Sequence, residues 1–267
     1  MSRLATRFEQ LKSQQRKALV SYVMAGDPHP QVTVPLLHQM VEAGVDVIEL
    51  GLPFSDPMAD GPVIALAAER ALAGGTNTLD ALDMVKAFRE KDQTTPVVLM
   101  GYLNPVEVIG YEKFVAYAKD CGVDGVLLVD LPPEESKQFG EVLKQNEMDQ
   151  IFLLAPTSTD KRIQHVVNHA SGFVYYVSLK GVTGAATLDT SEAAARIAKI
   201  KTMTDVPVGV GFGISDAASA KAMGQVADAV IVGSAFVKSF ATLPADDAVQ
   251  ETVNKVKELR AALDELV

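Results

Sequence analysis

Short apolar runs alternate with amphipathic stretches along the whole chain. The runs are rich in β-branched residues and nearly continuous in apolar character, which is typical of parallel strands that helices cover on their outer side. Turn-forming residues separate each run from the next stretch. The pattern predicts eight strands, at Ala18–Met24, Val45–Leu50, Pro96–Gly101, Gly125–Val129, Gln150–Leu154, Gly172–Ser178, Val206–Val210 and Ala227–Val232.

The stretches between these strands predict amphipathic helices. A helix at Arg3–Gln15 precedes the first strand, and a short helix is expected within Pro62–Ala73. The others are predicted at Gln31–Ala43, Thr78–Glu90, Val106–Lys119, Pro133–Gln145, Lys161–His169, Ser191–Thr202, Ala217–Gln225 and Asp246–Leu266.

Eight strand–helix units in roughly 250 residues are typical of a (β/α)8 TIM barrel, an α/β fold, here with an extra N-terminal helix. The alternative is a doubly wound open sheet, which rarely uses eight such units and needs a dinucleotide fingerprint for functional support. The one candidate, Gly209-Val-Gly-Phe-Gly213, is not GxGxxG. No segment resembles a linker, so we predict a single domain over residues 1–267.

Composition limits the classes of function. Hydrophobic residues make up 48% of the 267 residues and charged residues 22%, as in ordinary globular proteins. No run of about 18 apolar residues is present, and residues 1–9 show no signal region, so we expect a cytoplasmic protein without a membrane partner. The net charge of −10 argues against nucleic acid.

Cysteine and histidine usage argues against a metal centre. Cys121 is the one cysteine, which excludes an internal disulfide and a cysteine-based metal site. His165 and His169 are four residues apart on a predicted polar helix, and we interpret them as solvated. We therefore predict no metal.

The segment Asp46–Val63 carries the clearest candidate chemistry. Glu49 lies in an apolar strand, where a buried carboxylate is costly unless it has a task, and strand alternation sets it on one face with Val47 and Gly51. Asp60 follows on a loop stiffened by prolines. Since barrel chemistry lies on the loops after the strands, we expect Glu49 to act as a general acid/base and Asp60 to accept a substrate N–H or O–H.

Three glycine-bearing turns follow the last three predicted strands: Gly181-Val-Thr-Gly184, Gly211-Phe-Gly-Ile-Ser215 and Gly233-Ser-Ala235. Barrels commonly bind phosphate with backbone N–H groups of such loops, and glycine allows close approach of the anion. Ser234 adds a hydroxyl donor. The turns predict a small phosphate ester as ligand.

Further residues are candidates for the pocket wall. Tyr175 faces inward with Phe173 and Val177 by strand alternation, whereas Tyr22 and Met100 lie near the ends of their strands and suit the walls of a site for a flat ring, or filling of the barrel. Lys180, after the sixth strand, leaves a Schiff-base aldolase open as an alternative, although nothing at that position desolvates it.

These residues resemble the tryptophan synthase α chain family. The similarity rests on Glu49-Leu-Gly-Leu-Pro-Phe-Ser-Asp-Pro-Met-Ala-Asp-Gly-Pro62, on two of the glycine turns and on Tyr22-Val-Met-Ala-Gly-Asp-Pro28, in the same order. It implies cleavage of indole-3-glycerol phosphate to indole and glyceraldehyde 3-phosphate, a carbon–carbon lyase reaction of tryptophan synthesis. Glu49 matches the family's acid/base and Asp60 the acid that holds the indole N–H.

The resemblance also implies roles for further positions and a partner. Tyr175, Thr183 and Phe212 match pocket positions, and Gly184, Gly213, Gly233 and Ser234 match the phosphate site. The family's partner is a β chain carrying pyridoxal phosphate, in an α2β2 heterotetramer, so no cofactor is implied for this chain. Asp56-Pro57 and Asn104-Pro105 match the docking surface.

Two positions depart from the family pattern. Tyr22 stands where phenylalanine is common, and Leu179-Lys180 replaces a small pair that often contains arginine. A non-catalytic barrel that only activates another subunit is a further alternative.

Overall fold

The computed structural model describes residues 2–177, 190–211 and 213–267, and within them the strands form one sheet with every pair parallel. The sheet order is β5-β4-β3-β2-β1-β9-β8-β7-β6. The strands are β1 (Ala18–Met24), β2 (Val47–Gly51), β3 (Val97–Gly101), β4 (Gly125–Leu128), β5 (Asp149–Gln150), β6 (Phe152–Leu154), β7 (Val174–Val177), β8 (Val208–Gly211) and β9 (Ala229–Val232).

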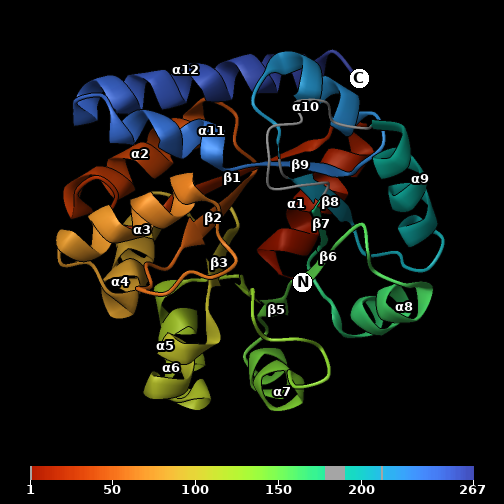
Figure 1. Cartoon of the computed structure of the whole chain (residues 1–267), viewed down its shortest axis with the longest axis horizontal. Helices are drawn as coiled ribbons and strands as arrows, with labels where there is room; N and C mark the ends of the chain where they lie inside the picture. Colours follow the sequence, from red (N-terminus) through yellow and green to blue (C-terminus); the bar gives the residue numbers. More distant parts are fainter. Residues whose placement is uncertain (1, 178–189, 212) are drawn as a thin grey trace.

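The sheet closes on itself because β5 and β6 are two parts of one run, separated by Ile151. β5 pairs with β4 and β6 with β7, and the Ile151 N–H donates to the Val126 carbonyl at 3.0 Å. The strand predicted at Gln150–Leu154 is therefore present, divided into β5 and β6. Figure 1 shows the strands at the centre with helices around them, which confirms the predicted (β/α)8 barrel.

Side-chain alternation along the strands separates two apolar layers. Val20, Val47 and Val98 point into the barrel, whereas Ile48 and Leu50 join the larger cluster between strands and helices. All of them are fully buried. The face that carries Val47 also carries Glu49, as predicted, so its carboxylate is directed into the barrel.

The outer layer consists of α2 (Pro30–Glu42), α3 (Pro62–Ala73), α4 (Thr78–Arg89), α5 (Leu103–Ile109), α6 (Tyr111–Cys121), α7 (Lys137–Gln145), α8 (Asp160–His169), α9 (Thr190–Lys201), α10 (Ala217–Gly224), α11 (Ser234–Val237), the 3-10 helix η1 (Lys238–Ala241) and α12 (Ala245–Asp264). Of the helices that the structure describes, none is long and apolar enough to cross a membrane.

Two helix predictions were wrong in detail. The single helix predicted at Val106–Lys119 is two helices, because Gly110 between α5 and α6 has φ of 90°, outside the helical region. The helix predicted from Pro133 begins only at Lys137, since residues 132–136 form turns. The helix predicted within Pro62–Ala73 is confirmed and occupies that whole range, whereas α11 and η1 were not predicted.

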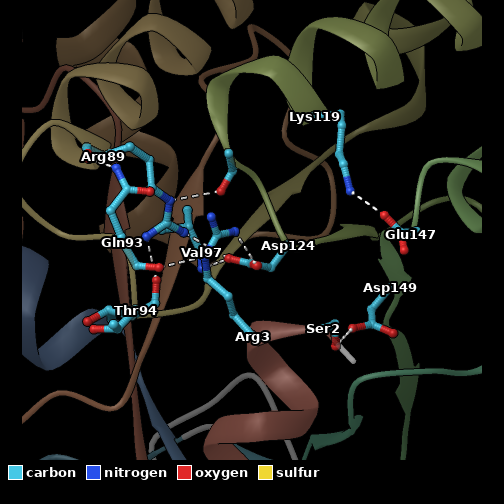
Figure 2. A network of polar contacts seen from close by, with 12 residues as sticks. Ser2, Arg3, Arg89, Gln93, Thr94, Val97, Lys119, Asp124, Glu147 and Asp149 are labelled. Carbon is cyan, nitrogen blue, oxygen red and sulfur yellow. Dashed lines mark hydrogen bonds and ion pairs between the residues drawn. The ribbon is translucent and has the colours of Figure 1, made fainter.

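The N-terminal helix α1 (Arg3–Ser13) closes the bottom of the barrel. Its residues Leu4, Phe8 and Leu11 belong to the same buried cluster as the inward side chains of the strands. Figure 2 shows how its start is fixed: Arg3 pairs with Asp124 at 2.9 Å, and the Ser2 hydroxyl donates to Asp149 at 2.8 Å. The opposite, C-terminal end of the barrel is left for a site.

Three aspartates that directly precede a strand brace the bottom rim, namely Asp46, Asp124 and Asp228. Each accepts a backbone N–H from the first or second residue of the preceding strand, at 2.8 to 2.9 Å, and pairs with a base on an outer helix at 2.7 to 3.0 Å. The N–H groups belong to Leu19, Val97 and Val208, and the bases are Arg260, Arg89 and Lys201. Each aspartate thereby links two neighbouring strands to one outer helix.

Candidate active site

A cavity of about 400 Å³ opens at the C-terminal end of the barrel, on the side where the sequence predicts the chemistry. The described residues that line it come from six strands, four loops and the helices α3 and α11: Tyr22, Glu49, Ala59, Asp60, Gly61, Ile64, Met100, Val129, Leu153, Tyr175, Val177, Gly213, Ile214, Ser215, Ile231, Gly233, Ser234 and Ala235. Most of them are apolar, so the cavity suits a ligand with a hydrophobic body and a few polar groups.

Glu49 lies at the centre of β2, with Tyr22 of β1 and Val98 of β3 as its register partners. Its side chain is 1% exposed, and neither carboxylate oxygen has a hydrogen-bond partner among the described residues. Burial raises the pKa of Glu49 to about 8. The group therefore holds a proton at neutral pH and can both donate and accept one there.

Asp60 reaches the same cavity from the loop after β2. Tight turns shape this loop: the Asp60 N–H donates to the Pro57 carbonyl at 3.0 Å, and the Met58 N–H to the Asp56 carbonyl at 2.9 Å. Burial raises the pKa of Asp60 to about 6, and the nearby Tyr102 hydroxyl opposes this rise. Asp60 is thus ionised at neutral pH while Glu49 is protonated.

Two tyrosines form walls of the cavity, and both lie over a glycine of the neighbouring strand. A Cβ added at Gly51 would come within 2.3 Å of the Tyr22 hydroxyl, and one at Gly211 within 2.4 Å of the Tyr175 hydroxyl. Glycine is required at both positions to seat the rings. Burial and the nearby Glu49 raise the pKa of Tyr175, so its phenol stays protonated.

The loops after β8 and β9 supply small polar residues to the cavity. Gly213 has φ of 75°, which favours glycine, and Gly233 precedes Ser234 at the start of α11. The part of the cavity lining that the structure describes contains no lysine or arginine. In this described part of the lining, backbone N–H groups and hydroxyls are the donors available to an anion.

The structure brings eight predicted site residues to one cavity: Tyr22, Glu49, Asp60, Met100, Tyr175, Gly213, Gly233 and Ser234. Thr183, Gly184 and Phe212, together with Lys180, lie outside the described residues. In the described ranges no group of three or more histidine, cysteine or acidic side chains is arranged to hold a metal ion.

Sequence reasoning missed Tyr102 and the apolar residues Ile64, Ile214 and Ile231. The isoleucines carried no signal that separates a pocket wall from ordinary core. Tyr102 directly follows a strand, at the rim where barrel sites lie, and that position is the one signal that points to it.

Comparisons with known proteins agree with this geometry. The family model described as Tryptophan synthase alpha chain matches residues 8–266. The chain is 89% identical to the tryptophan synthase alpha chain of Acinetobacter baumannii and 87% identical to that of Acinetobacter baylyi, and each comparison covers all of both chains. The chain belongs to the tryptophan synthase alpha chain family.

Solved structures of the family have the same fold. Tryptophan synthase subunit alpha from Legionella pneumophila is 41% identical and superimposes with a TM-score of 0.91, covering 99% of each chain. A chain of tryptophan synthase from M. tuberculosis, in an aminoacrylate-bound form, is 35% identical with a TM-score of 0.88, over 98% of this chain and all of that one. The family resemblance seen in the sequence is thereby confirmed.

The activity follows from the family. As a tryptophan synthase alpha chain, the protein is a lyase that cleaves indole-3-glycerol phosphate to indole and glyceraldehyde 3-phosphate, in tryptophan biosynthesis. The enzyme class and the reaction predicted from the sequence are confirmed.

Proposed function

We propose that Glu49 carries out the proton transfers of this cleavage. Glu49 gives its proton to the indole ring carbon that bears the side chain, and it then removes the proton of the adjacent glycerol hydroxyl. The carbon–carbon bond breaks as the hydroxyl carbon becomes an aldehyde, and the bonding electrons return to the ring. The observation that carries this proposal is a buried carboxyl in the cavity with a pKa of about 8, neither of whose oxygens has a hydrogen-bond partner among the described residues.

Asp60 has a separate role in this proposal. Its carboxylate accepts the indole N–H and stabilises the positive charge that develops on the ring when the ring carbon is protonated. The different pKa values of the two acids support this division, because a group near 6 is charged at the pH where a group near 8 is protonated.

The remaining predicted residues bind the substrate. Tyr22, Met100 and Tyr175 contact the ring, with Thr183 and Phe212 predicted beside them. Gly213, Gly233 and Ser234 hold the phosphate through N–H and hydroxyl groups, with Gly184 predicted to join them. Their position in one cavity with both acids supports this assignment. We propose that the chain itself uses no metal or cofactor.

For the assembly, we propose docking to a β chain that carries pyridoxal phosphate, in an α2β2 complex. The expected contacts are Asp56-Pro57 and Asn104-Pro105. Two highly exposed apolar side chains in the same segments support this surface, Met58 at 84% and Val108 at 80%. A cytoplasmic location stays a prediction.

Indole release by the purified chain tests the proposal. With indole-3-glycerol phosphate and no added metal or cofactor, slow but measurable indole formation is expected, and it excludes a purely activating subunit. Borohydride added with the substrate distinguishes the Schiff-base alternative. A covalent adduct on Lys180, seen by mass spectrometry, would replace Glu49 chemistry with an aldolase mechanism, whereas an unmodified lysine agrees with the proposal.

A further inference from the structure

Helix α3 connects the loop that carries Asp60 to a buried ion pair outside the cavity. The helix begins at Pro62, two residues after Asp60, and its residue Ile64 lines the cavity. In the last turn of the helix, Arg70 donates its Nε and Nη2 hydrogens to the two carboxylate oxygens of Asp27, at 2.7 and 2.9 Å. One end of α3 therefore faces the cavity, and the other end is bound to Asp27.

This ion pair is buried and its geometry is directional. The side chain of Asp27 is 2% exposed and that of Arg70 is 26% exposed. A planar guanidinium that binds both oxygens of one carboxylate fixes the direction as well as the distance of the contact. Neither residue is among the described residues that line the cavity. The pair can therefore affect the substrate only through the elements that it joins.

The loop after β1, which carries Asp27, is itself held in place. The N–H of Gly26 donates to the hydroxyl of Thr33 on α2 at 2.9 Å. Gly26 has φ of 85°, and a Cβ added there would be 2.0 Å from the Thr76 hydroxyl oxygen, in the turn that follows α3. The N–H of Thr76 donates to the carbonyl of Ala71 on α3 at 3.0 Å. The loop is thus fixed to α2 and packs closely on the C-terminal end of α3.

The apolar contacts of α3 are less directional than the ion pair. Its buried face consists of Ala67, Ala68 and Ala71, which belong to one cluster with Tyr22 and Met24 of β1. Figure 1 shows α3 beside β1 and α11, and it packs on both. Burial of apolar surface is non-directional, and methyl groups form a shallow face that can slide along its partner. The ion pair supplies the directional contact that this face lacks.

We propose that Asp27 and Arg70 are positioning residues for the cavity, because their ion pair fixes α3 along its axis. The position of α3 in turn places Ile64 and Asp60 against the substrate. Arg70 is eight residues from Pro62, about 12 Å along the helix axis, and a helix passes a shift of one end to the other. The inference rests on the substrate cavity and the role of Asp60 in the proposed function.

The first test is Asp27→Asn, which keeps the shape of the side chain and removes the charge and one acceptor oxygen. The matched control is Asp124→Asn, because Asp124 forms the same kind of buried pair with Arg89 at the bottom of the barrel, at 2.8 Å. Both variants should unfold at lower urea concentration than the wild type. Only Asp27→Asn should raise KM for indole formation, by about tenfold, since small displacements of a binding group carry such costs.

The two variants are compared at a temperature at which circular dichroism shows both of them folded. The control Asp124→Asn should then keep the wild-type kcat and KM. A wild-type KM in Asp27→Asn, or an equal rise of KM in both variants, would overturn the inference, because the pair would then contribute to stability alone.

A second substitution covers the case in which Asp27→Asn does not fold. Arg70→Lys keeps the positive charge, but an ammonium group cannot bind both carboxylate oxygens as a planar fork does. KM should therefore rise by about threefold, and an unchanged KM would overturn the inference. Where both variants fold, Arg70→Lys added to Asp27→Asn should cause no further loss, because the two residues act through one contact. Additive losses would contradict a shared role.

Binding of an unreactive indole-alkyl phosphate separates this inference from the proposed function. Thermal stabilisation by this ligand reports on the cavity without the chemistry. Weaker stabilisation of Asp27→Asn, together with a normal rate of Asp60→Asn, would support the placement of Ile64 by the pair and reject the proposed role of Asp60. Unchanged stabilisation of Asp27→Asn, together with an inactive Asp60→Asn, would reject the inference and leave the proposed function in place.

Discussion

The hydroxyl of Tyr175 lies directly over the backbone of Gly211, so that an added Cβ would be 2.4 Å from the phenol oxygen. The two residues are on adjacent strands, β7 and β8, and their contact sets the height of the ring in the cavity. The sequence places Gly211 in a phosphate-binding turn, but the structure makes it the last residue of β8, beneath an aromatic wall.

Gly211→Ala should therefore displace Tyr175 and weaken substrate binding. We expect KM to rise by about ten- to a hundredfold, because small displacements of a binding group carry costs of this order. Gly140→Ala is the control: its Cβ also meets an atom, at 2.6 Å, but this is the amide end of Gln150 on the outer layer. Equal KM values in the two variants would show that the ring adjusts freely.

Glu49→Gln should abolish proton transfer by residue 49 while it preserves the shape of the cavity. We expect kcat to fall by about 10² to 10⁴, the usual contribution of general acid/base catalysis, with little change in the affinity for an unreactive indole-alkyl phosphate. Stopped indole assays and thermal stabilisation by that ligand measure the two quantities. Near-normal turnover would remove Glu49 from the mechanism.

The same variant should change how stability depends on pH. The pKa of Glu49 is about 8 in the folded protein and near 4.5 when unfolded, so the folded state binds the extra proton between these values. The wild type is most stable, relative to Glu49→Gln, below about pH 4.5, and it loses this advantage as pH rises to 8. The loss is roughly 5 kcal/mol at 1.36 kcal/mol per pKa unit. Urea unfolding of both proteins from pH 5 to 9 measures it.

Asp124→Ala should destabilise the barrel and spare catalysis. Asp124 is buried, accepts the Val97 N–H and pairs with Arg89 and Arg3, so its loss leaves a buried guanidinium without its carboxylate. We expect the free energy of unfolding, measured with urea, to fall by about 3 kcal/mol or more. Asp228→Ala removes the same arrangement at a more exposed site, 37% for its side chain, and should cost about 1 kcal/mol. Equal losses would contradict this ranking.

Periodicity could predict the barrel because each strand is apolar on both faces and each helix on one. The acids of the site could also be predicted, since Glu49 interrupts an apolar strand and Asp60 lies on a proline-stiffened loop. The division of the predicted helix at Gly110 could not be predicted, because it depends on a positive φ that the hydrophobic pattern does not reveal. Tyr102 bonds a loop 43 residues earlier, and such a contact depends on how two loops fold toward each other.

The last prediction concerns the partner. Indole is small and apolar and would diffuse away if released, so direct transfer to the next site is favourable. A docked β chain should also hold the loop that carries Asp60 closed, and this excludes water from Glu49. We expect the β chain to raise indole formation by well over tenfold.

Substitutions on the predicted docking surface test where this activation arises. Asp56 and Asn104 are exposed, and Pro57 and Pro105 are half-buried beside them, outside the lining of the cavity. Pro57→Ala or Asn104→Ala should therefore lower the stimulation by the β chain more than the basal rate. Rates with and without the β chain give the ratio directly, and Gln164→Ala on α8 serves as the control on an outer helix. If both substitutions lower the basal and the stimulated rate equally, these residues support the active site, and docking must use another surface.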